Sequence, residues 1–230
     1  MPERRAINLA TIETVAKALG EINDDVVYVG GAVVSLYVTE NGAEQARPTM
    51  DIDISVQVSS YAGMEILRQK LAGKGIYPTP SETVMYRYSF GGILLDFIPF
   101  EDTPLGPTNR WLKPGFDKAY PVNIGVIEIK ILPVSFFLAT KWEAFKSRGG
   151  DYRMSHDFED IIYIINNNSD LVDDVFKGDE KVRDFLKEMG EEILSNPFLN
   201  EIIECHLTPF TASERRGIII EKLKKISSIN

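Results

Sequence analysis

The chain has 230 residues, 44% apolar and 26% charged, a balance that excludes a disordered polypeptide. Its net charge of −9 at pH 7 disfavours nucleic-acid binding unless a local basic patch is present. The single cysteine, Cys205, excludes an intrachain disulfide framework, and no apolar stretch approaches the roughly 20 residues of a membrane span. We therefore expect a globular, cytoplasmic protein with no membrane segment.

Helices and strands alternate in the first 132 residues. Apolar residues recur at helical spacing over residues 6–19, and Gly20 ends this pattern. Residues 85–90 and 93–100 flank Gly91-Gly92, a two-residue hairpin signal. The other elements expected here are a strand over 26–29, a helix over 32–38, a loop over 39–48, a strand carrying Asp51 and Asp53, a helix over 64–71, a loop over 101–118 and a strand over 126–130.

After Pro133 the sequence shows only helical patterns. The expected helices cover residues 133–146, 157–165 with Ser155 as N-cap, 172–176, 180–194, 197–205 and 213–226. This change predicts two domains, residues 1–132 and residues 133–230. The expected fold class is α+β, with a small mixed sheet flanked by helices and followed by an all-helical C-terminal half.

Three aspartates are candidate metal ligands. Asp51 and Asp53 lie on one strand, so both carboxylates point to the same face, about 7 Å apart along the backbone. Asp96 interrupts an otherwise apolar strand, and a buried carboxylate requires a cation, a hydrogen-bond cage or a metal. An ion pair with Arg87 is the simplest alternative. Together, the three carboxylates suit Mg²⁺, which prefers oxygen ligands and bridges to substrate phosphates.

A glycine pair is the candidate phosphate site. Gly30-Gly31 follows an apolar strand and precedes a predicted helix, so its backbone N–H groups could approach an anion closely. Ser35, one turn further on, could add a hydroxyl or simply be a surface serine. The position of the glycine pair ahead of the two acids favours a shared site for metal and phosphate.

Charged residues in the helical half allow two interpretations. Lys141 shares a helical stripe with Phe137 and Phe145, so it either snorkels to solvent or faces an anion. Arg148 lies seven residues after Lys141 on the same face. Asp157 and Asp160 share a face in a first helical turn, where acids also complement the helix dipole.

Two groups of basic residues could bind nucleic acid. The first is Arg110 with Lys113. The second could equally be a solvated helical C-terminus, whose dipole favours cations; it consists of Arg215, Arg216, Lys222, Lys224 and Lys225.

The order of these motifs resembles the DNA polymerase β-type nucleotidyltransferase superfamily. The resemblance rests on Gly30-Gly31, then Arg47-x-Thr49-x-Asp51-Ile-Asp53, then Asp96. The later segments Ala139-Thr-Lys141-Trp-Glu143-Ala144-Phe-Lys-Ser-Arg148-Gly149 and Ser155-His-Asp157-Phe-Glu-Asp160-Ile are similar to AbiEii-type toxins of abortive-infection and toxin–antitoxin systems. The first motif departs from the pattern of many superfamily members, which have Gly-Ser there. The resemblance spans about residues 25–165.

The resemblance implies a nucleotidyltransferase that moves a nucleoside monophosphate from an NTP to a tRNA, a protein or a small acceptor. It implies a nucleotidyltransferase sheet in the first domain, Mg²⁺ as the cofactor and a cognate antitoxin as a partner. The implied metal ligands are Asp51, Asp53 and Asp96. The implied catalytic set adds Lys141, Asp157 and Asp160, and the implied nucleotide-binding residues are Gly30, Gly31, Ser35, Lys141 and Arg148.

Two other functions are compatible with the residues. A catalytically silent module could use this fold to bind a partner, although a scaffold has no need of three converging carboxylates. A metal-dependent phosphohydrolase would also use clustered acids and Mg²⁺, with water in place of the acceptor hydroxyl. The chain has only two histidines, His156 and His206, which argues against most histidine-rich hydrolases.

Overall fold

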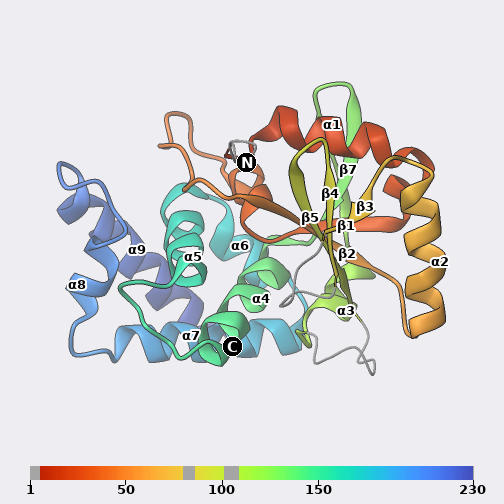
Figure 1. The fold of residues 1–230 in the computed structure, drawn as a ribbon. Helices are drawn as coiled ribbons and strands as arrows, with labels where there is room; N and C mark the ends of the chain where they lie inside the picture. The colour runs from red at the N-terminus through yellow and green to blue at the C-terminus, as the bar shows by residue number, and fades with distance from the viewer. Residues whose placement is uncertain (1–5, 80–85, 101–108, 230) are drawn as a thin grey trace. The chain divides into compact units, whose positions relative to one another are not determined.

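The computed structural model describes residues 6–79, 86–100 and 109–229. Within it the chain forms two compact units, which are coloured along the sequence in Figure 1. The first unit contains Met1–Val33 and Arg47–Pro133, and the second contains Val34–Ala46 and Val134–Asn230. Residues 34–46 therefore group with the C-terminal helices, although they lie within the first half of the sequence.

A mixed sheet is the centre of the first unit. In the described residues it has seven strands in the order β3-β4-β5-β2-β1-β7-β6. The strands are β1 (Val26–Val29), β2 (Asp51–Val56), β3 (Tyr77–Pro78), β4 (Arg87–Phe90), β5 (Ile93–Pro99), β6 (Tyr120–Ile124) and β7 (Ile127–Ile131). β1 pairs with β7 and β2 pairs with β5 in parallel, whereas the other neighbours are antiparallel. The predicted α+β class with a mixed sheet is confirmed.

Local sequence signals explain the helices of this unit. They are α1 (Leu9–Leu19), the 3₁₀ helix η1 (Gly20–Asp25), α2 (Tyr61–Ala72) and α3 (Leu112–Phe116). The side chain of Asn8 accepts a hydrogen bond from the Thr11 N–H and caps α1, and Ser60 caps α2 in the same way. Gly20 ends α1 with φ of +59°, a conformation that favours glycine. The predicted helix over residues 6–19 is thus confirmed, with a later start.

The second unit is helical. Its helices are α4 (Val134–Ser147), α5 (His156–Asn167), α6 (Leu171–Phe176), α7 (Glu180–Leu194), α8 (Leu199–Glu204) and α9 (Ala212–Ser227). Ser155 caps α5, as predicted, by accepting a hydrogen bond from the Phe158 N–H. α4 packs against α5 and α7, and α9 packs against α5 and α7. Among the described residues, no helix is both long and apolar enough to span a membrane.

The predicted loop over residues 101–118 is wrong where the structure describes it. Residues Leu112–Phe116 form α3, and β6 follows as an unpredicted partner of β7. Pro114 and Pro121 obscured both elements, because proline usually marks a turn. Pro121 is tolerated since β6 is an edge strand, where a missing N–H costs little. Met85 and residues 101–108, which also belong to predicted elements, lie outside the described residues.

The segment after the glycine pair also differs from expectation. The helix predicted over residues 32–38 is a 3₁₀ helix, η2 (Gly31–Tyr37). Its Val33-Val34 pair is β-branched, which weakens a regular α-helix, and 3₁₀ geometry is common in such short connecting helices. The phosphate argument for Gly30-Gly31 therefore depends on the local backbone and not on the dipole of a long α-helix.

Candidate active site

Strand register aligns two of the predicted acids in one row across the sheet. Asp53 on β2 lies opposite Asp96 on β5, and Asp96 lies opposite Arg87 on β4. Directly opposed residues on neighbouring strands share a face, and Asp51 shares that face because it lies two residues before Asp53. All three predicted carboxylates therefore lie on one face of the sheet, together with one arginine.

Arg87 binds two of these carboxylates. Its Nε donates to Asp96 Oδ1 at 2.8 Å, and its Nη2 contacts Asp96 Oδ2 at 2.6 Å and Asp51 Oδ2 at 2.9 Å. The hydrogen bond with Asp96 is the largest cause that raises the pKa of Arg87 above its usual value. The pairing of Arg87 with Asp96 is the alternative to a metal that the sequence allows, whereas the second contact, to Asp51, does not follow from the sequence. Spacing alone could not reveal it, because it depends on the register of three strands.

The glycine pair packs directly against the acid strand. Gly30 has φ of +72°, and a Cβ at this position would lie 1.8 Å from Asp53 Oδ2. A Cβ at Gly31 would lie 2.8 Å from Arg47 Nη2. Gly30 therefore requires glycine, because its φ is positive and a Cβ would also lie 2.9 Å from the Cβ of Asp53. At Gly31 the close neighbour is the end of a flexible arginine side chain, which can move aside. Thr49 donates its hydroxyl to Asp51 Oδ1 at 3.3 Å, so the motif residues before the acids also belong to this site.

The residues of this site fit a magnesium ion in type. Asp51, Asp53 and Asp96 offer carboxylate oxygens, the donors that Mg²⁺ prefers. The described part of the chain, however, contains no group of three or more His, Cys, Asp or Glu side chains already placed to hold a metal. In this structure the guanidinium of Arg87 instead donates hydrogen bonds to oxygens of Asp51 and Asp96.

The predicted cluster of the helical half also forms. Lys141 Nζ lies 3.2 Å from Asp157 Oδ1 and 2.7 Å from Asp160 Oδ2. The lysine is 7% exposed and Asp160 is 1% exposed. Of the two interpretations of its aromatic stripe, the lysine therefore faces anions and does not snorkel to solvent. Its Nζ lies 5.8 Å from the ring centroid of Phe137, which adds a cation–π contact.

Asp157 connects this buried lysine to an exposed cation. Arg148 Nη1 donates to Asp157 Oδ2 at 2.6 Å, and the arginine side chain is 72% exposed. Asp157 thus orients Arg148 while neutralising Lys141. His156 is exposed and contacts Glu159 at 3.0 Å, so it stays outside this cluster. Ser35, predicted to bind nucleotide, is exposed in η2 and groups with the second unit.

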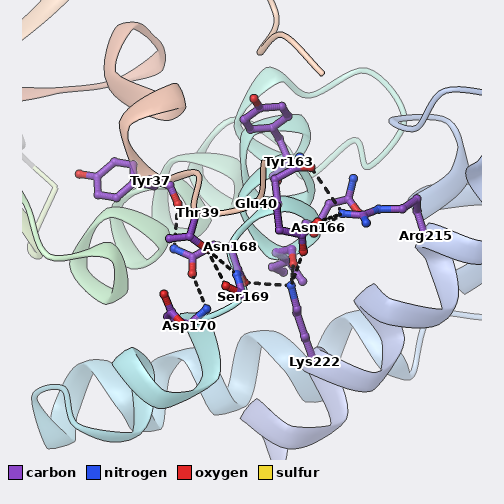
Figure 2. A network of polar contacts seen from close by, with 12 residues as sticks. Tyr37, Thr39, Glu40, Tyr163, Asn166, Asn168, Ser169, Asp170, Arg215 and Lys222 are labelled. Atoms are coloured by element: carbon purple, nitrogen blue, oxygen red, sulfur yellow. Dashed lines mark hydrogen bonds and ion pairs between the residues drawn. The ribbon is translucent and has the colours of Figure 1, made fainter. Parts of the chain in front are cut away.

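Two residues of the basic group near the C-terminus, Arg215 and Lys222, belong to an internal network of polar contacts (Figure 2). Arg215 Nη2 lies 2.9 Å from Glu40 Oε2 and donates to the Asn166 carbonyl at 2.6 Å. Lys222 Nζ donates to the carbonyls of Ile165 and Asn168 at 2.8 and 2.9 Å. These cations therefore satisfy backbone carbonyls at the C-terminal end of α5, which have no partner within the helix. Burial lowers the pKa of Lys222, while Glu40 opposes that change.

The same network fixes residues 34–46. The backbone N–H groups of Thr39 and Glu40 both donate to the Asn167 carbonyl at 3.1 Å. Asn168 Nδ2 donates to the Tyr37 carbonyl at 2.8 Å, as Figure 2 shows. This segment begins after Val33, the last residue of the first part of the first unit, and the chain returns to that unit at Arg47. Residues 34–46 are therefore held by the helices of their own unit.

Replacing Arg215 by Ala is expected to loosen this anchor. The change removes charge-assisted hydrogen bonds, each worth about 1.5–3 kcal/mol, so we expect a loss of about 2 kcal/mol in the free energy of unfolding. Hydrogen exchange at the amides of Thr39 and Glu40 should accelerate. The matched control is Arg216→Ala, because Arg216 pairs with Glu204 instead. Unchanged exchange in the Arg215 variant would contradict the anchoring role.

Residues 18–216 match a family model of nucleotidyltransferases, which identifies the protein as an enzyme of this class. The model is described as the nucleotidyl transferase AbiEii toxin of a type IV toxin–antitoxin system, and because it covers most of the chain, the chain belongs to the AbiEii family.

One solved structure is similar at a TM-score of 0.48 and 16% identity: the crystal structure of an antigenic nucleotidyltransferase-like protein from Paracoccidioides brasiliensis. That similarity covers 91% of this chain and 100% of the other. A comparison with curated protein sequences gives no match.

Proposed function

We propose that the protein transfers a nucleoside monophosphate from an NTP to a hydroxyl of a tRNA or protein acceptor, in a reaction that requires a divalent metal. The observation that supports this most is the row of Asp53 and Asp96, with Asp51 on the same face and Gly30 packed against it. A phosphate-binding glycine turn beside convergent carboxylates is what metal-assisted phosphoryl transfer needs.

Different residues of the first unit would have different roles in this reaction. Asp51, Asp53 and Asp96 would hold Mg²⁺, which when bound neutralises charge that develops on the triphosphate. The acceptor oxygen forms a bond to the α-phosphorus as the bond to the bridging α–β oxygen breaks, and pyrophosphate leaves. Asp96 would accept the proton of the acceptor hydroxyl. Gly30 and Gly31 would let backbone N–H groups approach the phosphates.

The cluster of the second unit suits an anion-binding role. Arg148 presents an exposed guanidinium whose direction is set by Asp157, and such a fork matches phosphate oxygens. Lys141 would contact the triphosphate only if its pairing with Asp157 and Asp160 is exchanged, since it is buried between these acids. We propose Arg148 as the first contact of a phosphate and Lys141 as the residue that positions the acids.

Membership of this family supports the proposal that the protein is the toxin of a toxin–antitoxin pair. The matching family is described as a toxin of a type IV system, so we propose that a cognate antitoxin controls the toxicity of this transferase. A tRNA acceptor would require local cations on a chain with a net charge of −9. Arg110, whose guanidinium lies 5.0 Å from the ring centroid of Trp111, is one such cation in the first unit.

The function is tested by incubating the protein with each α-labelled NTP, Mg²⁺, and either total tRNA or a soluble protein extract. The matched variants are Asp51→Ala and Asp53→Ala. Label that enters RNA or protein only with the intact acids would establish transfer and would identify base and acceptor together. A chelator added before the NTP should prevent labelling if the reaction needs the metal.

Two other results would overturn the proposal. Release of labelled mononucleotide without a labelled macromolecule would indicate a phosphohydrolase. No turnover with any NTP, together with metal-independent capture of a partner protein, would indicate a silent binding module.

A further inference from the structure

Arg87 occupies an unusual position for a structural cation. It lies on β4 directly opposite Asp96, in the row that also contains Asp53. Its guanidinium makes two contacts with Asp96 and one with Asp51, so both acids share one cation. Without this arginine, three carboxylates on one face of the sheet would repel one another.

The oxygens that Arg87 contacts are those a divalent cation would need. The guanidinium engages both oxygens of Asp96 and Oδ2 of Asp51, with distances of 2.6 to 2.9 Å. Charge-assisted hydrogen bonds of this length orient the carboxylates toward the arginine. Consistent with this, the described acids do not form a group already placed to hold a metal.

We propose that Arg87 is a built-in competitor of the metal, which holds Asp51 and Asp96 together until a divalent cation displaces its guanidinium. This inference rests on the proposed function, because it assumes that the three acids are the metal ligands. The side chain of Arg87 is 24% exposed and that of Asp51 is 30% exposed. The forked guanidinium of Arg87 can therefore move into solvent while strand β4 stays in place. In this exchange the metal replaces the guanidinium as the positive partner of Asp51 and Asp96.

The experiment measures Mn²⁺ binding without nucleotide, from the signal of free Mn²⁺ in electron paramagnetic resonance. Arg87→Ala should tighten the dissociation constant of Mn²⁺ by about tenfold or more, since it removes charge-assisted hydrogen bonds that the metal must otherwise break. Arg87→Lys keeps the charge but loses the fork and should tighten binding to a smaller extent. The matched control is Arg68→Ala, which removes the same charge from an ion pair on α2.

Thermal unfolding provides the second measurement. Arg87→Ala should lower the melting temperature without metal, and added Mn²⁺ should raise it by more than it does in the unmodified protein. A purely structural arginine would lower the melting temperature with no gain in metal response. That result, or Mn²⁺ affinity that is unchanged in both Arg87 variants, would overturn the inference. Affinity raised by Arg87→Ala but unchanged by Arg87→Lys would also overturn it, because net charge and not the fork would be responsible.

Variants of the acids separate the failure of this inference from the failure of the proposed function. If Mn²⁺ binding depends on Asp51 and Asp96 but not on Arg87, the metal site stands and only the competition is wrong. If Asp51→Asn and Asp96→Asn leave Mn²⁺ binding unchanged, the three acids are not the metal site, and both proposals fail.

Discussion

Replacement of Asp53 by Asn is expected to lower kcat for nucleotide transfer on the order of 10³-fold. Asp53 lies in the middle of the site, opposite Asp96 and against Gly30. The amide keeps the shape of the carboxylate, so its packing against the glycine is preserved while the charge of a proposed metal ligand is lost. A metal contributes several kcal/mol to the stabilisation of developing charge, and each factor of ten in rate corresponds to about 1.4 kcal/mol.

The measurement is the initial rate of label transfer at saturating NTP, with circular dichroism and melting temperature recorded for each variant. Asp25→Asn is the matched control, because it makes the same chemical change at an exposed position of the first unit. We expect the control to retain full activity. An Asp53→Asn variant that is folded and active at more than about a tenth of the normal rate would exclude this carboxylate as an essential metal ligand.

The local motifs were visible in the sequence because their geometry is set by short-range rules. Alternation along a strand places Asp51 and Asp53 on one face, and helical spacing places Asp157 and Asp160 together. Both expectations agree with the structure, in which Lys141 contacts the two helical acids. Resemblance to a family supplied the link between the acid strand and Asp96, which no local pattern could show.

Long-range features could not be predicted in the same way. The bridge from Arg87 to Asp51 depends on the register of β4, β5 and β2. The grouping of residues 34–46 with the helices depends on contacts such as Glu40 with Arg215, which are 175 residues apart. The five basic residues near the C-terminus could be read as a nucleic-acid patch or as a solvated helix end, and neither reading predicts that Arg215 and Lys222 satisfy carbonyls at the end of α5.

Replacement of Lys141 by Met is expected to lower the free energy of unfolding of the helical unit by about 3–5 kcal/mol. The change keeps most of the side-chain volume but removes the cation from Asp160, which is 1% exposed. Without this cation, the buried carboxylate of Asp160 keeps the full free-energy cost of its removal from water. Unfolding in urea can be followed by the fluorescence of Trp142, which is buried on α4, in a Trp111→Phe background.

Arg148, the exposed cation of the same cluster, provides the control. Arg148 contacts the same Asp157 but is 72% exposed, so Arg148→Ala should cost no more than about 1 kcal/mol. The double variant Lys141→Met/Asp160→Leu should recover much of the lost stability, because it removes the buried charge together with its partner. If the lysine and arginine variants lose similar stability, burial does not decide the energetics of this cluster. A double variant as unstable as Lys141→Met alone would show that packing, and not charge, is what the lysine contributes.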